Sequence, residues 1–336
     1  SFRLHSVAFI GDIEKMYRNV WVDEKDRCLQ RILWRPNVSE PVRDYELCTV
    51  TYGTVSASFQ AQKSLEVIAD GLVTVNPAAA CAIRCCFYMD DLLYSAPTVE
   101  DAIKVRGAIH TALAEAHFNL RKYASNSRDL LSTIEPENVA LSAFDLRSET
   151  KILVLGLIWD PVADLFRVKI GACDDVDISS ITKRIVLSFT ARIFDSLGFL
   201  SPFVVRFKIL LQKIWFDKFG WDDLVSQESK REFESLIVAV ESLSSFSVQR
   251  PYCLKGDVVI YQLIAFCDVS VLAYCATVYL KSTGKNGESD FYLVAAKIKV
   301  APIPKAKKTA KDEEEMTIHR LELMAALLLS CLVERV

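Results

Sequence analysis

Residues 81–96 read CAIRCCFYMDDLLYSA, and they predict the fold of the first part of the chain. Two adjacent carboxylates, Asp90 and Asp91, separate the apolar run 81–88 from a second apolar run at 92–96. The pattern predicts a strand, a tight turn and a second strand, with the acidic pair at the tip. The alternative is an ordinary exposed hairpin turn, because Asp is a common turn residue.

A third carboxylate, Asp12, follows a predicted strand at 7–10 and precedes a helix predicted over 13–20. If the strands are neighbours, Asp12 lies beside Asp90 and Asp91. Phosphoryl transfer onto a 3′-hydroxyl uses two divalent ions about 4 Å apart that carboxylates bridge. Mg²⁺ prefers a few carboxylates plus substrate phosphate oxygens. The three residues are therefore candidates for metal-dependent nucleotidyl transfer, whereas the alternative for Asp12 is a helix N-cap.

The composition is that of a globular chain. Its 336 residues leave room for two or three domains, and 51% apolar with 25% charged residues argues against general disorder. The net charge of −3 gives no global attraction to nucleic acid, so any such site needs a local basic face. There is no apolar run of about 18 residues to span a membrane, so no membrane contact is expected.

Ten cysteines without a C-x-x-C pair, and only four histidines, make a zinc site improbable. Cys81, Cys267, Cys275 and Cys331 lie in apolar strings, and we expect them to be buried as small hydrophobic residues. This usage fits a reducing intracellular compartment, the cytoplasm.

Apolar periodicity predicts the remaining elements. Helices are expected after a Ser56 cap through 62–69, after Thr98 through 113, and over 182–195, 203–215 and 320–336. Strands are expected at 152–159, 165–170, 260–266, 273–280 and 291–300. The polar stretch 126–150 is predicted to be an irregular connection, and the charged stretch 305–315 an exposed loop. Because residue 1 is Ser and the last helix pattern has no stop signal, we expect a piece of a larger polyprotein.

The two helices predicted over 182–215 combine an apolar side with basic residues. The basic residues are Lys183, Arg184, Arg192, Arg206 and Lys213, the last two seven apart and hence on one face. A helical hairpin with a basic outer side suits the backbone of a nucleic-acid duplex. A solvated helix face is an equally good interpretation.

Several motifs, in order, resemble those of retroelement reverse transcriptases. FIGDIEKMY at 9–17 resembles the first catalytic motif, Tyr52-Gly53 with Ser56 the template-contacting motif, and FYMDD at 87–91 the signature hairpin. Later stretches resemble the form found in BEL/Pao long-terminal-repeat retrotransposons: NLRKYASN at 119–126, LGLIWD at 155–160, TKR at 182–184, ARIFDSLGFLSP at 191–202 and RLEL at 320–323. The resemblance covers nearly the whole chain.

This resemblance implies a role for each matching position. Asp12, Asp90 and Asp91 would form the metal-binding triad of a polymerase palm, with two Mg²⁺ ions per site or Mn²⁺ in their place. Tyr17 would stack under the incoming sugar and exclude a 2′-hydroxyl, unless it is simply an aromatic residue buried in the palm. Lys122 would protonate the leaving pyrophosphate, unless it is an exposed charge without a role.

Further contacts with substrate are implied for Gly53, Tyr88 and Met89, and for Gly156 and Trp159 at the ends of a strand turn that positions the primer. Glycine at 156 would allow close approach of the backbone.

The last region resembles the ribonuclease H fold, which cuts the RNA of a hybrid with four carboxylates and two metal ions. Asp268 on the first strand and Glu322 on the first helix match two of these catalytic, metal-binding carboxylates. The other two would lie beyond Val336, and Glu322 alternatively is an acid that favours the start of a helix.

The middle of such polyproteins is also labelled a retrotransposon peptidase. An aspartic protease needs paired Asp-Thr/Ser-Gly turns. Asp195-Ser196-Leu197-Gly198 has Leu where Gly is required and has no second copy, so no peptidase chemistry is predicted.

These observations predict an α+β chain with three parts. Residues 1–125 would form a palm of antiparallel sheet and helices with incomplete fingers, 126–255 a helical thumb or connection with the peptidase label, and 256–336 a truncated ribonuclease H-like α/β domain. The predicted reaction adds deoxynucleotides from deoxynucleoside triphosphates to a primer on an RNA or DNA template. The remaining parts of the pol polyprotein are expected partners. The alternative is an inactive remnant that serves as a nucleic-acid-binding or structural module.

Overall fold

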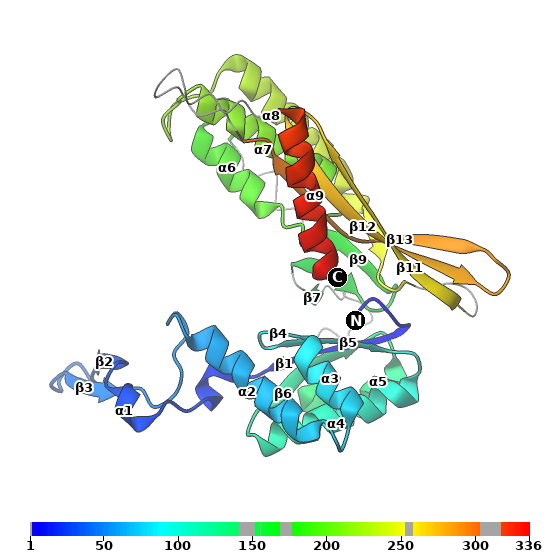
Figure 1. Cartoon of the computed structure of the whole chain (residues 1–336). Coiled ribbons are helices and arrows are strands. Elements are labelled where there is room, and N and C mark those ends of the chain that lie inside the picture. Colours follow the sequence, from blue (N-terminus) through cyan, green and yellow to red (C-terminus); the bar gives the residue numbers. More distant parts are fainter. Residues whose placement is uncertain (1, 141–151, 155, 169–176, 253–257, 303–316) are drawn as a thin grey trace. The chain divides into compact units, whose positions relative to one another are not determined.

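The computed structural model describes residues 2–140, 152–154, 156–168, 177–252, 258–302 and 317–336, as a mixture of helices and sheets that confirms the α+β class (Figure 1). The chain divides into two compact units. The first comprises 1–150 with 161–164, and the second comprises 151–160 with 165–336. The predicted domain boundaries at 125 and 255 stay predictions.

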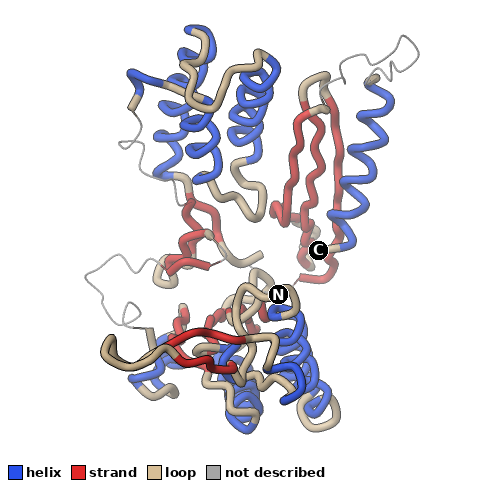
Figure 2. The backbone as a smooth tube through the Cα atoms, turned by 90° about the vertical axis from the view of Figure 1, so that its left-hand side faces the viewer, coloured by secondary structure: helices blue, strands red, loops and turns tan. Residues whose placement is uncertain are grey.

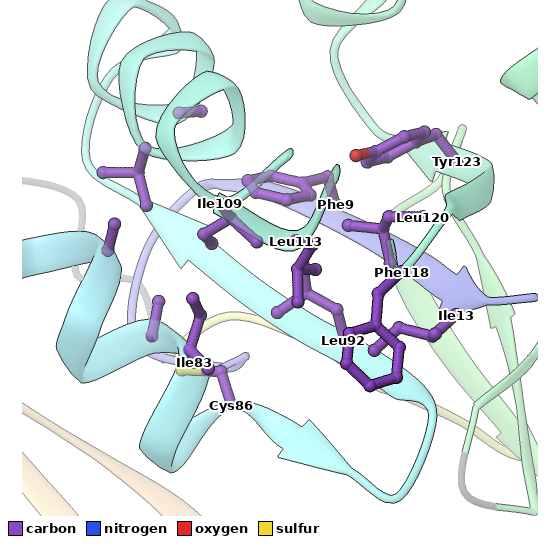
Figure 3. Close-up of a cluster of buried hydrophobic side chains, with 14 of the residues drawn as sticks. Phe9, Ile13, Ile83, Cys86, Leu92, Ile109, Leu113, Phe118, Leu120 and Tyr123 are labelled. Carbon is purple, nitrogen blue, oxygen red and sulfur yellow. The ribbon is translucent and has the colours of Figure 1, made fainter. Parts of the chain in front are cut away.

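The first unit is built on an antiparallel sheet of four strands in the order β4-β5-β1-β6. These strands are β1 (Val7–Ile13), β4 (Phe87–Tyr88), β5 (Asp91–Ala96) and β6 (Leu120–Ser125). Helices α2 (Ala57–Leu72), α3 (Pro77–Cys85) and α4 (Val99–Glu115) share their apolar core with the sheet. Figure 3 shows Phe9, Leu92 and Leu113 in this core.

Shorter elements complete the first unit. They are the 3-10 helices η1 (Met16–Asn19) and η2 (Pro136–Asn138), helices α1 (Glu24–Arg27) and α5 (Arg128–Ser132), and the hairpin of β2 (Arg31–Trp34) with β3 (Arg43–Glu46). Thr98 caps α4 as predicted, because its Oγ1 accepts a 3.1 Å hydrogen bond from the backbone N–H of Asp101. Ser56 precedes α2 but makes no side-chain cap.

Three predictions for this unit were wrong. The apolar run 81–88 is a strand only at 87–88, since α3 occupies 77–85. The helix is favoured there because Pro77 stands in its first turn and Asn76 caps it by accepting a 3.1 Å hydrogen bond from Ala79 N–H. Residues 13–20 are not one helix, because β1 runs to Ile13 and Lys15 adopts a left-handed φ of 51° before η1. The connection predicted over 126–150 contains α5 and η2, and residues 141–150 lie outside the described part.

The second unit contains a meander and a helical bundle. The meander has the order β10-β9-β8-β7, from β7 (Ile152–Val154), β8 (Leu157–Asp160), β9 (Leu165–Val168) and β10 (Ser247–Gln249). The bundle consists of α6 (Lys183–Arg192), α7 (Ser201–Phe216) and α8 (Gln227–Glu241), which lie side by side in Figure 2. Phe189, Phe207 and Phe233 meet at its centre with ring centroids 5.5–6.1 Å apart. The sequence predicted α6 and α7 but missed α8. The 3-10 turns η5 (Ile178–Ser180) and η6 (Ser242–Ser245) flank the bundle.

The same unit ends in three long antiparallel strands and a helix. Strands β11 (Val258–Val269), β12 (Ala273–Gly284) and β13 (Ser289–Val300) pair in chain order, and α9 (Ile318–Glu334) packs mainly on β12 and β11 (Figure 1). All four elements were predicted. The expected burial of cysteines was wrong: Cys81, Cys267 and Cys331 are exposed and Cys275 is half-buried, because their side chains lie on faces that the core does not use.

The turn between α6 and α7 is fastened to the edge of β13. The backbone N–H of Ala296 donates a 2.8 Å hydrogen bond to the carbonyl of Leu197. Gly198 has φ +82°, and a Cβ added there would overlap the Ala296 backbone. This close contact joins the bundle to the sheet within the second unit.

Gly198→Ala is expected to destabilise this unit more than Gly287→Ala does. Both glycines have nearly the same left-handed φ, +82° and +83°, but nothing lies within 4 Å of a Cβ at Gly287. Left-handed backbone costs an L-residue about 1–2 kcal/mol, and overlap at Gly198 adds about 1–3 kcal/mol. Urea unfolding of the two variants measures the difference. Equal losses of unfolding free energy would show that the turn does not press on β13.

Candidate active site

Strand pairing brings the predicted acidic residues of the first unit together. Asp12 of β1 stands directly opposite Asp91 of β5 in the antiparallel register. Side chains at such positions have Cβ atoms about 5 Å apart. The hairpin tip is tied to β1 as well, because Ile13 N–H donates a 2.9 Å hydrogen bond to the carbonyl of Asp90. Thus Asp12, Asp90 and Asp91 lie at the same end of the sheet.

The turn that carries Asp90 is tight and strained. Tyr88 pairs with Asp91, so Met89 and Asp90 form a two-residue loop, and Met89 has a left-handed φ of 59°. Two-residue loops favour glycine at such a position, and strain of this kind is concentrated at functional sites. Tyr88 is exposed, and Gln62 of α2 donates a 3.8 Å hydrogen bond to Met89 Sδ. This hydrogen bond connects the loop to α2.

A bulge in β6 aims Lys122 at the acidic residues. The register between β1 and β6 shifts between Ile10 and Asp12, and Lys122 has a left-handed φ of 53°. Its Nζ lies 3.2 Å from Asp12 Oδ1, although the lysine side chain is 71% exposed. An irregularity of this kind re-aims a side chain, and here it places a cation beside the carboxylates.

The carboxylates repel one another. Partial burial, together with the negative charges of Asp90 and Asp12, raises the pKa of Asp91 to about 6, and Lys122 opposes the shift. Nearby, a hydrogen bond from Arg121 lowers the pKa of Glu14. The end of the sheet therefore carries closely spaced negative charge that a bound cation would relieve.

The carboxylates do not by themselves surround a metal ion. Among the described residues, no group of three or more His, Cys, Asp or Glu side chains is arranged to hold one. The arrangement does fit an ion that takes some of its ligands from a substrate, since Mg²⁺ is commonly bound by one or two carboxylates plus phosphate oxygens.

Tyr17 lies in η1 beside α2, where its hydroxyl is 3.4 Å from Ser58 Oγ. Gly53 is in the exposed turn before α2. The sequence patterns did not indicate that Ser58 and Gln62 would lie beside predicted site residues. The signal that could have found them is their spacing of four on the predicted helix, which places both on one face.

The predicted primer-positioning turn has one glycine in close contact and one buried tryptophan. The ring of Phe194 lies where a Cβ of Gly156 would be. Trp159 is fully buried. We therefore correct its predicted contact with substrate: the indole belongs to the core, because Trp159 and Phe166 pair across β8 and β9 in the buried part of the meander.

The basic residues of the bundle do not form one outer face. Lys183 is only 5% exposed, and its Nζ lies 4.1 Å from the ring centroid of Trp215 and 5.4 Å from that of Trp221. Its predicted place on the exposed side was wrong, because the two indoles cover it and stabilise its charge.

The other four basic residues lie at the surface. Arg184 forms a bidentate pair with Asp222 at 2.7 and 2.9 Å, and Lys213 is 2.6 Å from Glu228. Arg192 and Arg206 are exposed. These two remain the clearest candidates for phosphate contact.

Asp268 and Glu322 stand on β11 and α9, which pack together. Both are exposed. Asp268 Oδ1 accepts a 2.8 Å hydrogen bond from Val269 N–H, and Glu322 lies 3.6 Å from His319 Nδ1. Within the described residues neither belongs to a group that could hold a metal ion.

Asp195 holds the α6–α7 turn together. Its Oδ2 accepts a 2.9 Å hydrogen bond from Leu200 N–H. Burial raises the pKa of Asp195, and hydrogen bonds from the backbone of Leu200, Phe199 and Gly198 oppose the shift. The carboxylate thus organises a loop.

Residues 182–336 match the family model of the Pao retrotransposon-like RNaseH-like domain. This match supports a fragment of a Pao retrotransposon pol protein. It covers the bundle α6–α8 together with β11–β13 and α9, and it indicates a family of nucleic-acid-processing enzymes. A peptidase is not part of the family's description. No curated protein matches the chain.

In the described part of the chain, no helix has the length and apolar character needed to cross a membrane.

The carboxyl of Asp91 is expected to titrate near pH 6, and Asp90→Asn is expected to lower that midpoint by removing a like charge. Because the folded-state pKa is raised above 3.8, the folded state binds the extra proton, and stability falls as pH rises through about 6. Carbon-13 NMR of the carboxyl measures the midpoint. Asp26→Asn, on the exposed helix α1, is the control and should leave it unchanged. A titration midpoint of Asp91 below pH 4 in the wild type would contradict the partial burial and charge repulsion described for this carboxyl.

Proposed function

We propose that this chain is the polymerase part of a retrotransposon pol protein, an RNA-directed DNA polymerase that adds deoxynucleotides to a primer. The observation that carries the proposal is the cross-strand register that sets Asp12 opposite Asp91, with Asp90 beside them at the hairpin tip. Resemblance of the surrounding motifs to reverse transcriptases supports the same assignment. In this proposal the first unit serves as the palm.

Asp12, Asp90 and Asp91 would hold two Mg²⁺ ions together with the triphosphate, and Mn²⁺ could take their place. When bound, such ions lower the pKa of the primer 3′-hydroxyl and neutralise charge on the transferred phosphoryl group and on pyrophosphate. The raised pKa of Asp91 supports this role, because burial and the neighbouring carboxylates disfavour its ionised form and a bound cation would stabilise that form. Mg²⁺ commonly takes part of its coordination from substrate phosphate oxygens, so a few carboxylates would suffice.

Two nearby side chains would act on the nucleotide. Lys122 projects from the bulge beside Asp12, where its ammonium could donate a proton to departing pyrophosphate. Tyr17 would stand under the sugar and exclude a 2′-hydroxyl, and its contact with Ser58 would hold the ring in that orientation. Gly53, Tyr88 and Met89 would line the path of template and nucleotide, and Gly156 that of the primer.

In the second unit, Asp268 and Glu322 would supply two of the four carboxylates of a ribonuclease H site. The match of 182–336 to an RNaseH-like family supports this role. The bundle would contact the template–primer duplex through Arg192 and Arg206 at its surface, whereas Lys183 would act only inside the fold.

A second candidate is an inactive retroelement remnant that binds nucleic acid or serves a structural role. The specific observation in its favour is that the described carboxylates form no group of three suited to a metal ion. Primer extension separates the two candidates.

Primer extension on an RNA template with Mg²⁺, by the pol protein that carries this chain, is the decisive test. Asp90→Asn and Asp91→Asn should each lower incorporation at least about 100-fold, the scale expected when one preorganised electrostatic group is lost. Asp26→Asn, an exposed carboxylate of the same unit, should retain activity. Incorporation that is equal in all four proteins would refute the polymerase assignment. Absence of incorporation from the wild type, with duplex binding retained, would favour the remnant.

Arg192→Ala with Arg206→Ala is expected to weaken binding of an RNA–DNA hybrid and to reduce its salt dependence. Each lost phosphate contact lowers the slope of log K against log salt by about 0.9. Fluorescence anisotropy over a salt series measures both effects. Arg231→Ala, an exposed cation of α8, is the matched control. A slope that the double variant leaves unchanged would remove the bundle from the duplex-binding surface.

A further inference from the structure

A cavity of about 300 Å³ opens between α9 and the sheet of the second unit, and its lining contains none of the residues assigned above to catalysis. Tyr274 of β12 and Met324 of α9 belong to its lining. Helix α9 buries Leu321, Ala325 and Leu328 toward the sheet and lies mainly over β12 and β11. Helix α9 has fewer contacts with β13 than with β12 and β11, and α7 also contacts β13.

The helix side of the cavity is apolar although it faces solvent. Leu327 is 66% exposed, and Met324 and Cys331 lie on the same stripe of α9 because the spacings are three and four residues. Exposed apolar side chains that line a hollow, rather than standing singly, indicate an interaction site.

The rim of the cavity carries three positive charges. Lys297 and Lys299 of β13 are exposed and point to the same side of the strand, about 6.7 Å apart along it. Arg335 stands at the end of α9. None of these three side chains takes part in an ion pair recorded among the described residues. Among the described residues, the cavity thus combines these three positive charges with the apolar side chains of α9.

We propose that this groove binds an acidic amphipathic helix of a partner protein. Carboxylates four residues apart on a helix are separated by about 6 Å, which matches the spacing of the two lysines. From Met324 to Arg335 the groove follows α9 for about 16 Å, or three turns. That length suits a helix with several carboxylates better than a ligand with one anionic head group. Leucine-like side chains of the partner would fill the cavity beside Leu327 and Tyr274.

Nucleic acid is the less suitable occupant of the same charges. A phosphate backbone pairs with lysine and arginine but has no apolar side chains to bury against Leu327 and Cys331. The apolar side chains of α9 would contribute to the affinity for an amphipathic helix but not to that for nucleic acid. A change to one of these side chains therefore distinguishes the two occupants.

The test uses a fluorescein-labelled helical peptide of 14 residues with leucines on one face and glutamates on the other, titrated with the full chain. Lys297→Glu with Lys299→Glu should weaken its binding at least tenfold, and the uncharged change Leu327→Asn should also weaken it at least tenfold by removing apolar contact. Arg231→Glu reverses an exposed charge elsewhere in the unit and should leave the affinity unchanged. Circular dichroism of each variant establishes that it is folded.

Cys331 gives an independent readout, because it lines the cavity while Cys267 is exposed elsewhere in the same unit. The peptide should slow alkylation of Cys331 at least fivefold and leave Cys267 unchanged, as resolved by mass spectrometry. Equal protection of both cysteines would overturn the proposal. Equal binding of a sequence-scrambled peptide would also overturn it. So would binding that Leu327→Asn leaves intact and that an RNA oligonucleotide abolishes.

Discussion

The pairing of β1 with β5 is the constraint on which the first unit depends. One antiparallel register both buries Phe9 and Leu92 in a common core and sets Asp12 against Asp91 at the open end of the sheet. Because side chains alternate along a strand, a slip of one residue would exchange the core and solvent faces and separate the carboxylates. Packing of the core therefore also fixes the geometry of the acidic site.

Repulsion within that site has to be balanced by the surrounding structure. Met89 and Lys122 have left-handed backbone, Lys122 contacts Asp12, and Gln62 contacts Met89. Met89 directly precedes Asp90, so all three contacts adjoin the carboxylates. Strain at Met89 and Lys122 persists because the surrounding fold over-determines these positions.

In the second unit, one turn connects two layers that differ in architecture. The Asp195 carboxylate accepts a hydrogen bond from Leu200 N–H within the loop. Because Gly198 has no side chain, the loop can pack against the backbone of Ala296. Ala296 N–H of β13 donates a hydrogen bond to the carbonyl of Leu197. The extent of the family match, which includes both bundle and sheet, agrees with this mutual packing. A motif that resembles part of a protease signature is thus explained by loop geometry.

The sequence by itself determined the identity of the acidic residues, the long strands of the second unit and most of its helices, because apolar periodicity and caps are local signals. Only the tertiary structure decided that 77–85 is helical, that Lys183 and Trp159 are buried, and that Ser58 and Gln62 adjoin the site. Burial depends on which neighbours arrive from distant parts of the chain. A residue's own spacing shows the face it occupies, whereas the packing of other elements decides whether that face meets solvent.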